Sequence, residues 1–267
     1  MESIVDVDIQ RISKDSNVHQ TDCVALESPL AINVIHNGQR HSLGILMRTP
    51  GNDTELVYGF LYCEGVIESI DDILNIQFDD GNCLAELSEK SKFDPEEHIR
   101  KTSVSSACGV CGRDSISNMI HVHGPEIMSG QNISLDIISN SIEVLRSSQS
   151  LFSATGGTHA AALIDFSGAL CNIAEDVGRH NALDKLIGSS MISRIMPLSN
   201  YLLVVSGRAS FELTYKAIKC GLPMMIAVGA PSSMAVEMSR EHGMTLVGFA
   251  KAEKISVYSC PSRVSND

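Results

Sequence analysis

The sequence predicts an α/β fold in which a mixed sheet carries helices on both faces, with a smaller α+β lobe in front of it. From Asn200 onward, short apolar runs alternate with amphipathic segments of helical length, a pattern typical of β-α-β units. Gly221 and Gly243 each follow one of these segments, as expected at the end of a helix. We expect a small lobe over residues 1–100, a flexible loop and the helix after it over 101–125, and the larger lobe over 126–267.

The small lobe begins with a predicted hairpin over Ala31 to Met47, because Asn37-Gly38 supplies the positive φ angles of a tight turn. A helix is predicted over Glu55 to Ile67, with Asn52 and Glu55 as a capping box. Residues 71–90 favour short strands. The charged stretch 90–100 is interpreted as a connector.

The larger lobe ends in three predicted parallel strands whose carboxyl ends share one edge of the sheet. In open α/β sheets that edge is where ligands bind. The three strands are 201–205, 224–228 and 245–249, and a further strand is predicted at 255–258. The helices are 211–220 and 232–242, and the loops at the edge are 206–210, 229–233 and 250–254.

Composition limits the partners that the protein can have. Its 267 residues, 43% of them hydrophobic, suffice for a full-sized core. A formal net charge of −12 argues against nucleic acid or an anionic membrane as the main partner. The start of the chain resembles no secretion signal, and no stretch approaches the roughly 18 uninterrupted apolar residues of a membrane span. We expect a soluble, cytoplasmic protein.

The strongest local motif is the pair Cys108 and Cys111, set among small residues in Ser105–Asp114. Three chemistries compete for two thiols at this spacing: a zinc site, a redox disulfide and a persulfide. Zinc lacks a second ligand pair of suitable spacing, and a thioredoxin-like pair would follow an early strand. Arg113 and the helix predicted at 115–122 would favour a thiolate. A surface loop with two incidental cysteines remains the fourth possibility, and the other six cysteines are interpreted as reduced and without a role.

Two further clusters suggest a pocket for an anion. The glycine-rich stretch Thr155–Ala161 and the charged stretch Glu175–Asn181 flank a predicted strand pair, although a capping and salt-bridge cluster explains the second equally well. In the other cluster, Gly207 and Arg208 follow a buried strand and precede a helix, where they could hold phosphate. No P-loop or dinucleotide glycine motif occurs in the sequence, which disfavours those two nucleotide chemistries.

Six blocks of the chain together resemble the formate dehydrogenase accessory sulfurtransferases, the FdhD family. The likeness runs in order through nearly the whole sequence. The blocks are RTPGNDTELVYGFLYCEG (48–65), SSACGVCGRDSI (105–116), TGGTHAAAL (155–163), EDVGRHNALDKLIG (175–188), SGRASFE (206–212) and APSSMAVE (230–237).

The resemblance implies a function, a fold and partners. The protein would accept sulfur from a cysteine desulfurase, with Cys108 holding the persulfide and Cys111 receiving or relaying it. It would then sulfurate the molybdenum of bis-molybdopterin guanine dinucleotide, bound as a substrate that a guanine nucleotide could mimic, for formate dehydrogenase. A cofactor-binding chaperone without sulfur chemistry is the alternative. The resemblance also implies a homodimer and a cytidine-deaminase-like fold for the larger lobe.

Cofactor contacts are predicted at three places. The resemblance points by position to a stretch near the C-terminus, and the glycine-rich and strand-end clusters supply the other two. Deamination itself is excluded, because the sequence lacks the glutamate of His-x-Glu and the Pro-Cys-x-x-Cys of zinc deaminases. The predicted contacts are Phe249, Ala250, Lys251, Ala252, Glu253, Lys254, Gly156, Gly157, Thr158, His159, Ser206, Gly207 and Arg208, and no metal ligand is assigned.

Overall fold

The computed structural model describes residues 3–102, 127, 131–251 and 254–266. No helix in this part of the chain has the length and apolar character that a bilayer crossing requires. The described elements are β1 (Ile4–Ile12), β2 (Asn17–Ala25), β3 (Ser28–His36), β4 (Gln39–Arg48), α1 (Asp53–Cys63), η1 (Ile70–Asp72), β5 (Ile73–Asp79), β6 (Asn82–Leu87), α2 (Pro95–Thr102), β7 (Ile133–Ser134), α4 (Leu135–Ser148), α5 (Ser150–Thr155), β8 (His159–Asp165), β9 (Leu170–Asp176), α6 (Arg179–Ile192), β10 (Tyr201–Val205), α7 (Phe211–Lys219), β11 (Met224–Ala227), α8 (Ser233–Glu241), β12 (Thr245–Lys251), β13 (Lys254–Ser259), η2 (Pro261–Arg263) and β14 (Val264–Ser265).

A six-stranded mixed sheet forms the centre of the molecule, in the order β13-β12-β11-β10-β8-β9. Strands β10, β11 and β12 are parallel, with Val205 beside Ala227 and Ile226 beside Val247. Strands β8, β9 and β13 join antiparallel. The predicted parallel strands and the mixed sheet are confirmed, because β-branched and other apolar runs of four to seven residues can be buried on both faces.

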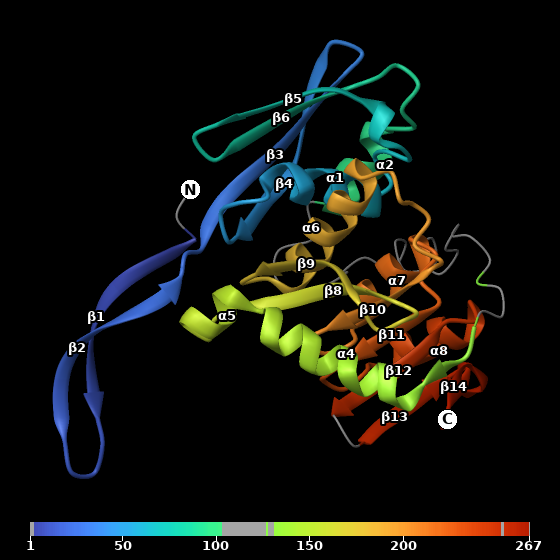
Figure 1. Ribbon diagram of the computed structural model, residues 1–267. Helices are drawn as coiled ribbons and strands as arrows, with labels where there is room; N and C mark the ends of the chain where they lie inside the picture. The colour runs from blue at the N-terminus through green and yellow to red at the C-terminus, as the bar shows by residue number, and fades with distance from the viewer. Residues whose placement is uncertain (1–2, 103–126, 128–130, 252–253, 267) are drawn as a thin grey trace.

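Helices cover both faces of this sheet, as predicted (Figure 1). Alternate residues of each strand contribute to two separate cores. Leu202 and Val204 face Ile138 and Ile142 of α4. Leu203 and Val205, which alternate with them along β10, belong to the larger core. That core also includes side chains from α6, α7 and α8.

A second sheet of four strands, β4-β3-β6-β5, forms the small lobe. The predicted hairpin is confirmed, since β3 and β4 pair antiparallel around Asn37 (φ 51°) and Gly38 (φ 74°). The strands predicted in 71–90 are β5 and β6. Strand β3 also pairs parallel with β6, a contact that no local sequence pattern predicts.

Three predictions in the small lobe are wrong. Asn52 forms no capping box, because it adopts a left-handed conformation (φ 54°) and its side chain accepts no bond from the helix backbone. The helix it precedes ends at Cys63 rather than Ile67, where Gly65 turns the chain at φ 80°. The stretch interpreted as a connector contains α2, which begins at Pro95 after the Asp94 carboxylate accepts a bond from the Glu96 amide.

Helices α1 and α6 cross in direct backbone contact and join the two sheets (Figure 1). A Cβ atom on Gly59 would lie 1.8 Å from the carbonyl oxygen of Asp184, and one on Gly188 would lie 1.8 Å from that of Glu55. The larger core therefore runs without interruption from Leu30 and Ile32 in the four-stranded sheet to the six-stranded sheet.

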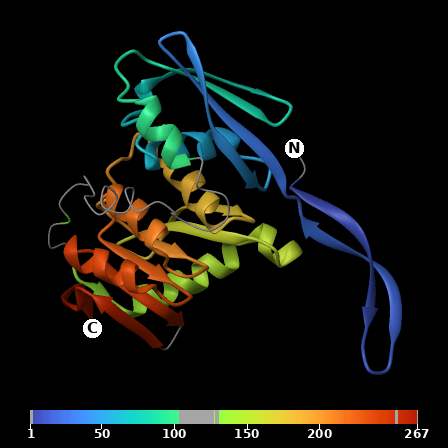
Figure 2. The same ribbon diagram turned by 180° about the vertical axis from the view of Figure 1, so that it is seen from behind.

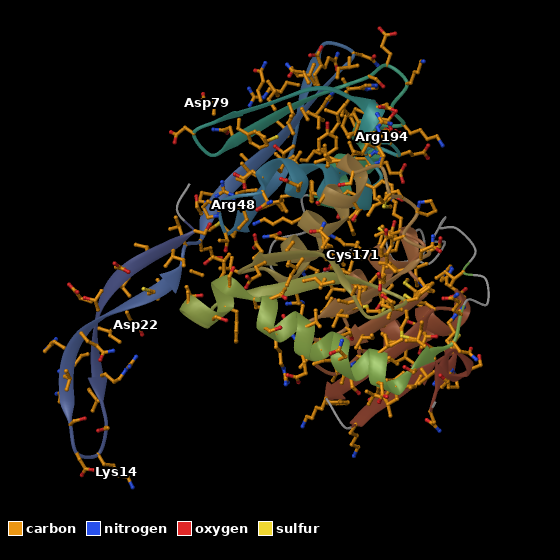
Figure 3. All side chains as sticks on the ribbon, in the orientation of Figure 1. Lys14, Asp22, Arg48, Asp79, Cys171 and Arg194 are labelled. Atoms are coloured by element: carbon orange, nitrogen blue, oxygen red, sulfur yellow. The ribbon has the colours of Figure 1, made fainter. Side chains whose placement is uncertain are left out.

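Strands β1 and β2 form a long antiparallel arm that projects from the body (Figures 1 and 2). Lys14 lies near its tip and Asp22 along its length (Figure 3). Ala25 at its base packs against the loop after α5, because a Cβ on Gly157 would lie 3.6 Å from the Ala25 Cβ. One face of the arm carries β-branched apolar side chains, namely Val5, Val7, Ile9, Val18 and Val24.

Candidate functional site: the carboxyl edge of the parallel strands

The predicted site residues divide into those that the structure describes and those outside it. Cys108 and Cys111 lie within residues 103–126, outside the described residues. Ala252 and Glu253 also lie outside the described residues. The remaining predicted contacts belong to the glycine-rich stretch before β8, to the loop after β10, and to β12 and β13.

The loops at the carboxyl ends of the parallel strands are joined by backbone hydrogen bonds. The Gly229 amide donates to the Gly207 carbonyl at 2.9 Å, and the Phe249 amide donates to the Gly229 carbonyl at 3.0 Å. Gly229 is required for this close approach, because a Cβ there would lie 3.0 Å from the Cα of Arg208. The loops after β10 and β11 and the end of β12, each predicted separately, therefore form one edge of the sheet.

His159, at the start of β8, belongs to the same edge. The Ser206 hydroxyl accepts a bond from the Ala160 amide at 2.9 Å, which fixes the loop after β10 beside β8. A Cβ on Gly207 would lie 3.4 Å from Nδ1 of His159. The structure therefore brings His159, Ser206, Gly207 and Phe249 together.

The beginning of α6 adds residues that were not among the predicted contacts. Arg179 approaches the edge, with its Cδ 4.0 Å from the position of a Gly207 Cβ. His180 Nε2 lies 2.7 Å from Oε2 of Glu212, the second residue of α7. The sequence carried a signal for them, since Arg179 and His180 lie in a dense charged motif, but only the fold shows that Glu212 faces this motif.

Electrostatic shifts at the edge follow from this packing. Partial burial, then the charges of Arg179 and His180, lowers the pKa of His159 below its ordinary value and favours a neutral imidazole. The close contact with His180 lowers the pKa of Glu212 despite partial burial, with Lys216 and Arg179 contributing. The edge thus combines a neutral imidazole, a carboxylate-held histidine and an arginine.

The two carboxylates of the charged motif have structural roles instead. Asp176 is fully buried, accepts bonds from the amides of Thr49 (3.1 Å) and Gly178 (2.8 Å), and pairs with Lys185 at 2.8 Å. The Glu175 carboxylate accepts two amide bonds at the beginning of α5, from Leu151 and Phe152. Together they hold the loop before α6 in place.

Some predicted contacts also have structural explanations. Gly156 ends α5 in a left-handed conformation (φ 66°), and the Thr158 hydroxyl donates to Glu175 at 3.0 Å. The side chain of Ala250 is buried in the smaller core, whereas its neighbours Phe249 and Lys251 are exposed. Contact of these residues with a cofactor stays a prediction.

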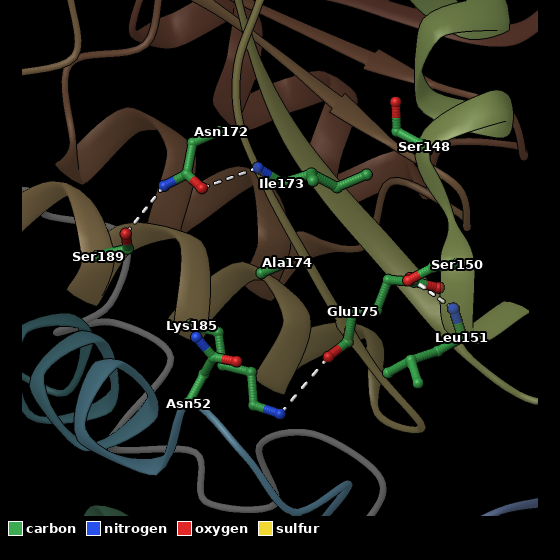
Figure 4. A pocket seen from close by; sticks show the side chains of 10 residues that line it. All are labelled: Asn52, Ser148, Ser150, Leu151, Asn172, Ile173, Ala174, Glu175, Lys185 and Ser189. Atoms are coloured by element: carbon green, nitrogen blue, oxygen red, sulfur yellow. Dashed lines mark hydrogen bonds between the residues drawn. The ribbon is translucent and has the colours of Figure 1, made fainter. Parts of the chain in front are cut away.

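A polar cavity of about 210 Å³ lies apart from the predicted contacts (Figure 4). Its hydrogen-bonding groups are used internally: Asn172 donates to Ser189 at 2.9 Å, and the Lys185 ammonium donates to the Thr49 carbonyl at 2.8 Å. It is lined by Asn52, Ser148, Ser150, Leu151, Asn172, Ile173, Ala174, Glu175, Lys185 and Ser189.

The fold and the edge define a class: an α/β protein whose strand-end edge carries arginine and histidine side chains beside glycine loops, without a classical nucleotide-binding motif. Comparison with known proteins narrows this class. A family model described as the FdhD/NarQ family matches residues 25–265, and the chain belongs to that family.

Relatives align over almost the entire chain. Sulfur carrier protein FdhD of Sulfurisphaera tokodaii is 39% identical over 259 residues, covering 97% of this chain and 98% of the relative. Sulfur carrier protein FdhD of Sulfolobus acidocaldarius is 41% identical over 258 residues, with 97% of each chain covered. A crystal structure from Desulfotalea psychrophila, described as a formate dehydrogenase accessory protein, superimposes with a TM-score of 0.79 at 24% identity, covering 99% of this chain and 100% of that one. The predicted family is confirmed, and the structural match supports the fold.

Proposed function

We propose that this protein is a sulfur carrier in formate dehydrogenase maturation. It accepts sulfur from a cysteine desulfurase on Cys108, with Cys111 receiving or relaying it. It then passes the sulfur, as sulfide, to the molybdenum of a bound bis-molybdopterin guanine dinucleotide. The two electrons that this transfer requires come from a second thiol, which forms a disulfide with the thiol that carried the persulfide. The observation that carries the proposal is the alignment of almost the entire chain with relatives named sulfur carriers.

The loading step requires no external oxidant. The Cys108 thiolate attacks the terminal sulfur of the desulfurase persulfide, so one S–S bond forms on Cys108 while the other breaks. The desulfurase cysteine leaves as a thiolate. Sulfur moves between thiols with no net change of oxidation state.

Four of the six described cysteines are poor alternatives for this role. Burial raises the pKa of the Cys63 thiol well above its ordinary value, and raises those of Cys83 and Cys220 to about 12. Cys171, though exposed, also has a raised thiol pKa, because of partial burial and the charge of Asp165. Since the thiolate is the nucleophile, these shifts favour the pair at 108 and 111.

The proposal extends to the setting of the reaction. The protein works in the cytoplasm as a homodimer, and its edge residues hold the phosphates of the cofactor substrate. The positive groups at that edge, in a chain of net charge −12, support a local site for an anion.

Intact-mass spectrometry tests the sulfur-carrier role. After incubation with a cysteine desulfurase and cysteine, the wild-type chain should gain about 32 Da per sulfur atom. Cys108→Ala should gain none and should fail to activate formate dehydrogenase, whereas Cys171→Ala, which removes an exposed thiol, should load like wild type. Activation of formate dehydrogenase by Cys108→Ala would instead favour a cofactor chaperone without sulfur chemistry.

A further inference from the structure

The outer side of β5 is a part of the small lobe to which the proposed function gives no task. β5 is the last strand of the four-stranded sheet, and among the described strands it pairs only with β6 (Figure 1). Beyond this pairing, residues 74–79 form no backbone hydrogen bond with the described residues. Every second residue of an edge strand turns its N–H and C=O away from the sheet, so this side of β5 presents unpaired donors and acceptors.

The two faces of the sheet differ at this strand. Ile76 and Phe78 point to the face that carries the core, where their partners on β6 are fully buried, yet Phe78 is 39% exposed. Gln77 and Asp79 point to the opposite face and are exposed. Leu74, the extra residue at a shift of register, is 64% exposed. A strand added beside β5 would therefore meet apolar side chains on one face and polar, acidic side chains on the other.

The chain around β5 is strongly acidic. From Glu68 to Glu89 it contains several carboxylates but no lysine or arginine. Lys92 reaches Glu68 at 2.8 Å. Arg194 reaches Asp71 at the same distance. The exposed carboxylates that pair with no cation among the described residues are Asp79, Asp80, Glu86 and Glu89.

These charges decide which kind of strand can pair with β5. Charged residues and bulges on edge strands hinder a second copy of the same chain from adding edge to edge. At this strand, carboxylates of the two copies would face each other, and like charges across paired strands are destabilising. A basic strand would meet opposite charges, which are stabilising across paired strands.

We propose that the outer side of β5 is a docking site for an extended segment of a partner protein in which apolar residues alternate with lysine or arginine. The segment adds to the sheet as a further strand through backbone hydrogen bonds. Its apolar side chains contact Ile76 and Phe78 on one face. Its basic side chains reach Asp79 and Glu86 on the other face, to which Glu86 belongs because it lies opposite Asn75. This inference stands without the sulfur-carrier role.

Fluorescence anisotropy with a labelled peptide of alternating valine and lysine, as long as β5, tests the docking site. Wild type should bind this peptide. Affinity should fall at least about tenfold when serine replaces the valines, when glutamate replaces the lysines, or when alternate backbone amides are N-methylated. These changes remove the apolar contacts, the charge attraction and the strand pairing in turn. Equal binding of the N-methylated peptide would mean attraction by charge alone and overturn the proposal, as would failure of wild type to bind.

The variant Asp79→Asn/Glu86→Gln tests whether the peptide binds at β5. Both carboxylates are exposed, and their loss should weaken peptide binding at least about fivefold at low ionic strength. Asp8→Asn/Asp15→Asn is the matched control, because it removes the same charge from exposed positions on the arm and should bind like wild type. Equal losses in both variants, or no loss in the first, would contradict the docking site. The peptide series decides the proposal if the first variant does not fold.

Sedimentation velocity separates a partner segment from a second copy of this chain. Saturating peptide should leave the molar mass of the protein assembly unchanged apart from the bound peptide. If the peptide instead converts dimers into monomers, a second copy occupies the outer side of β5 and the proposal is wrong.

Discussion

At the residue scale, two buried ion pairs connect elements that are distant in sequence. Lys185 pairs with Asp176 within the large lobe, and its ammonium also reaches the Thr49 carbonyl in the small lobe. Lys216 pairs with Asp184 at 2.6 Å, with both side chains less than a tenth exposed. Burial alone would lower the pKa of Lys216, but the charge of Asp184 raises it above the ordinary value. Lys216 therefore stays charged.

Removing one partner of the Lys216–Asp184 pair should be costly. Lys216→Met leaves a buried carboxylate without compensation, and we expect a loss of about 3–5 kcal/mol in the free energy of unfolding. Urea unfolding of Lys216→Met and of the double variant Lys216→Met/Asp184→Leu measures this. The double variant should recover much of the loss, and Lys92→Met, which breaks an exposed pair with Glu68, should have almost no effect. Equal effects of Lys216→Met and Lys92→Met would contradict the role of burial.

At the element scale, the crossing of α1 and α6 depends on two glycines without side chains between the helices. Gly59 and Gly188 let the backbones meet, and this contact carries the larger core from one sheet to the other. The same crossing fixes the direction of α6, whose first turn presents Arg179 and His180 at the strand-end edge. Helix packing in the interior thereby positions the candidate site.

Gly59→Ala tests this crossing. The new methyl group would overlap the Asp184 carbonyl, so the helices must separate, and we expect a loss of at least about 2 kcal/mol by chemical unfolding. Gly157→Ala serves as the control, because its Cβ would make only an ordinary contact with Ala25 at 3.6 Å. That variant should change stability by less than about 0.5 kcal/mol. An unaffected Gly59→Ala protein would show that the helices can shift freely.

At the scale of the whole molecule, the structure combines a body with a continuous core and an arm that reaches away from it (Figure 2). Two hydrogen bonds attach the base of the arm: the Leu26 amide donates to the Ser3 carbonyl, and the Ser3 hydroxyl donates to the Pro50 carbonyl. An isolated two-stranded hairpin is marginally stable in water. The body should therefore not depend on the outer half of the arm.

Shortening the arm tests this independence. Replacing residues 8–21 by Asn-Gly joins Val7 to its cross-strand partner Asp22 through a tight turn. Because the removed residues lie beyond the base, the melting temperature should change by less than about 2 °C in a calorimetric scan. A decrease several times larger would mean that the body relies on the arm for stability.

Predictions from sequence succeeded where a local pattern has one structural outcome. Asn37-Gly38 gives a tight hairpin because both residues tolerate positive φ, and Gly221 and Gly243 follow the ends of α7 and α8 at positive φ, as expected. The capping box at Asn52 was wrong because Gly51 and Asn52 both adopt positive φ, which removes the extended conformation that such a cap requires. The connector prediction missed α2, where Asp94 and Pro95 begin a helix rather than a turn.

For the candidate site, sequence motifs identified the segments but not the pairs of residues that meet. Glycine and strand-end patterns pointed to His159 and Gly207 independently, and the edge of parallel strands predicted that loops would gather there. Glu212 could not be matched with His180, because a contact between the beginnings of two helices depends on how both pack on the sheet. Cys108 and Cys111 were found by spacing and family resemblance, and they lie outside the described residues.

The sequence by itself determined the family, strands β3 to β6 and β8 to β13, helices α1, α7 and α8, and the glycine-rich turns. The elements follow from apolar periodicity and from the backbone preferences of neighbouring residues. Only the tertiary structure decided that α1 and α6 cross through Gly59 and Gly188, and that Glu212 meets His180 beside Arg179. Such contacts join residues far apart in the chain, and their geometry is set by packing of complete elements against one core.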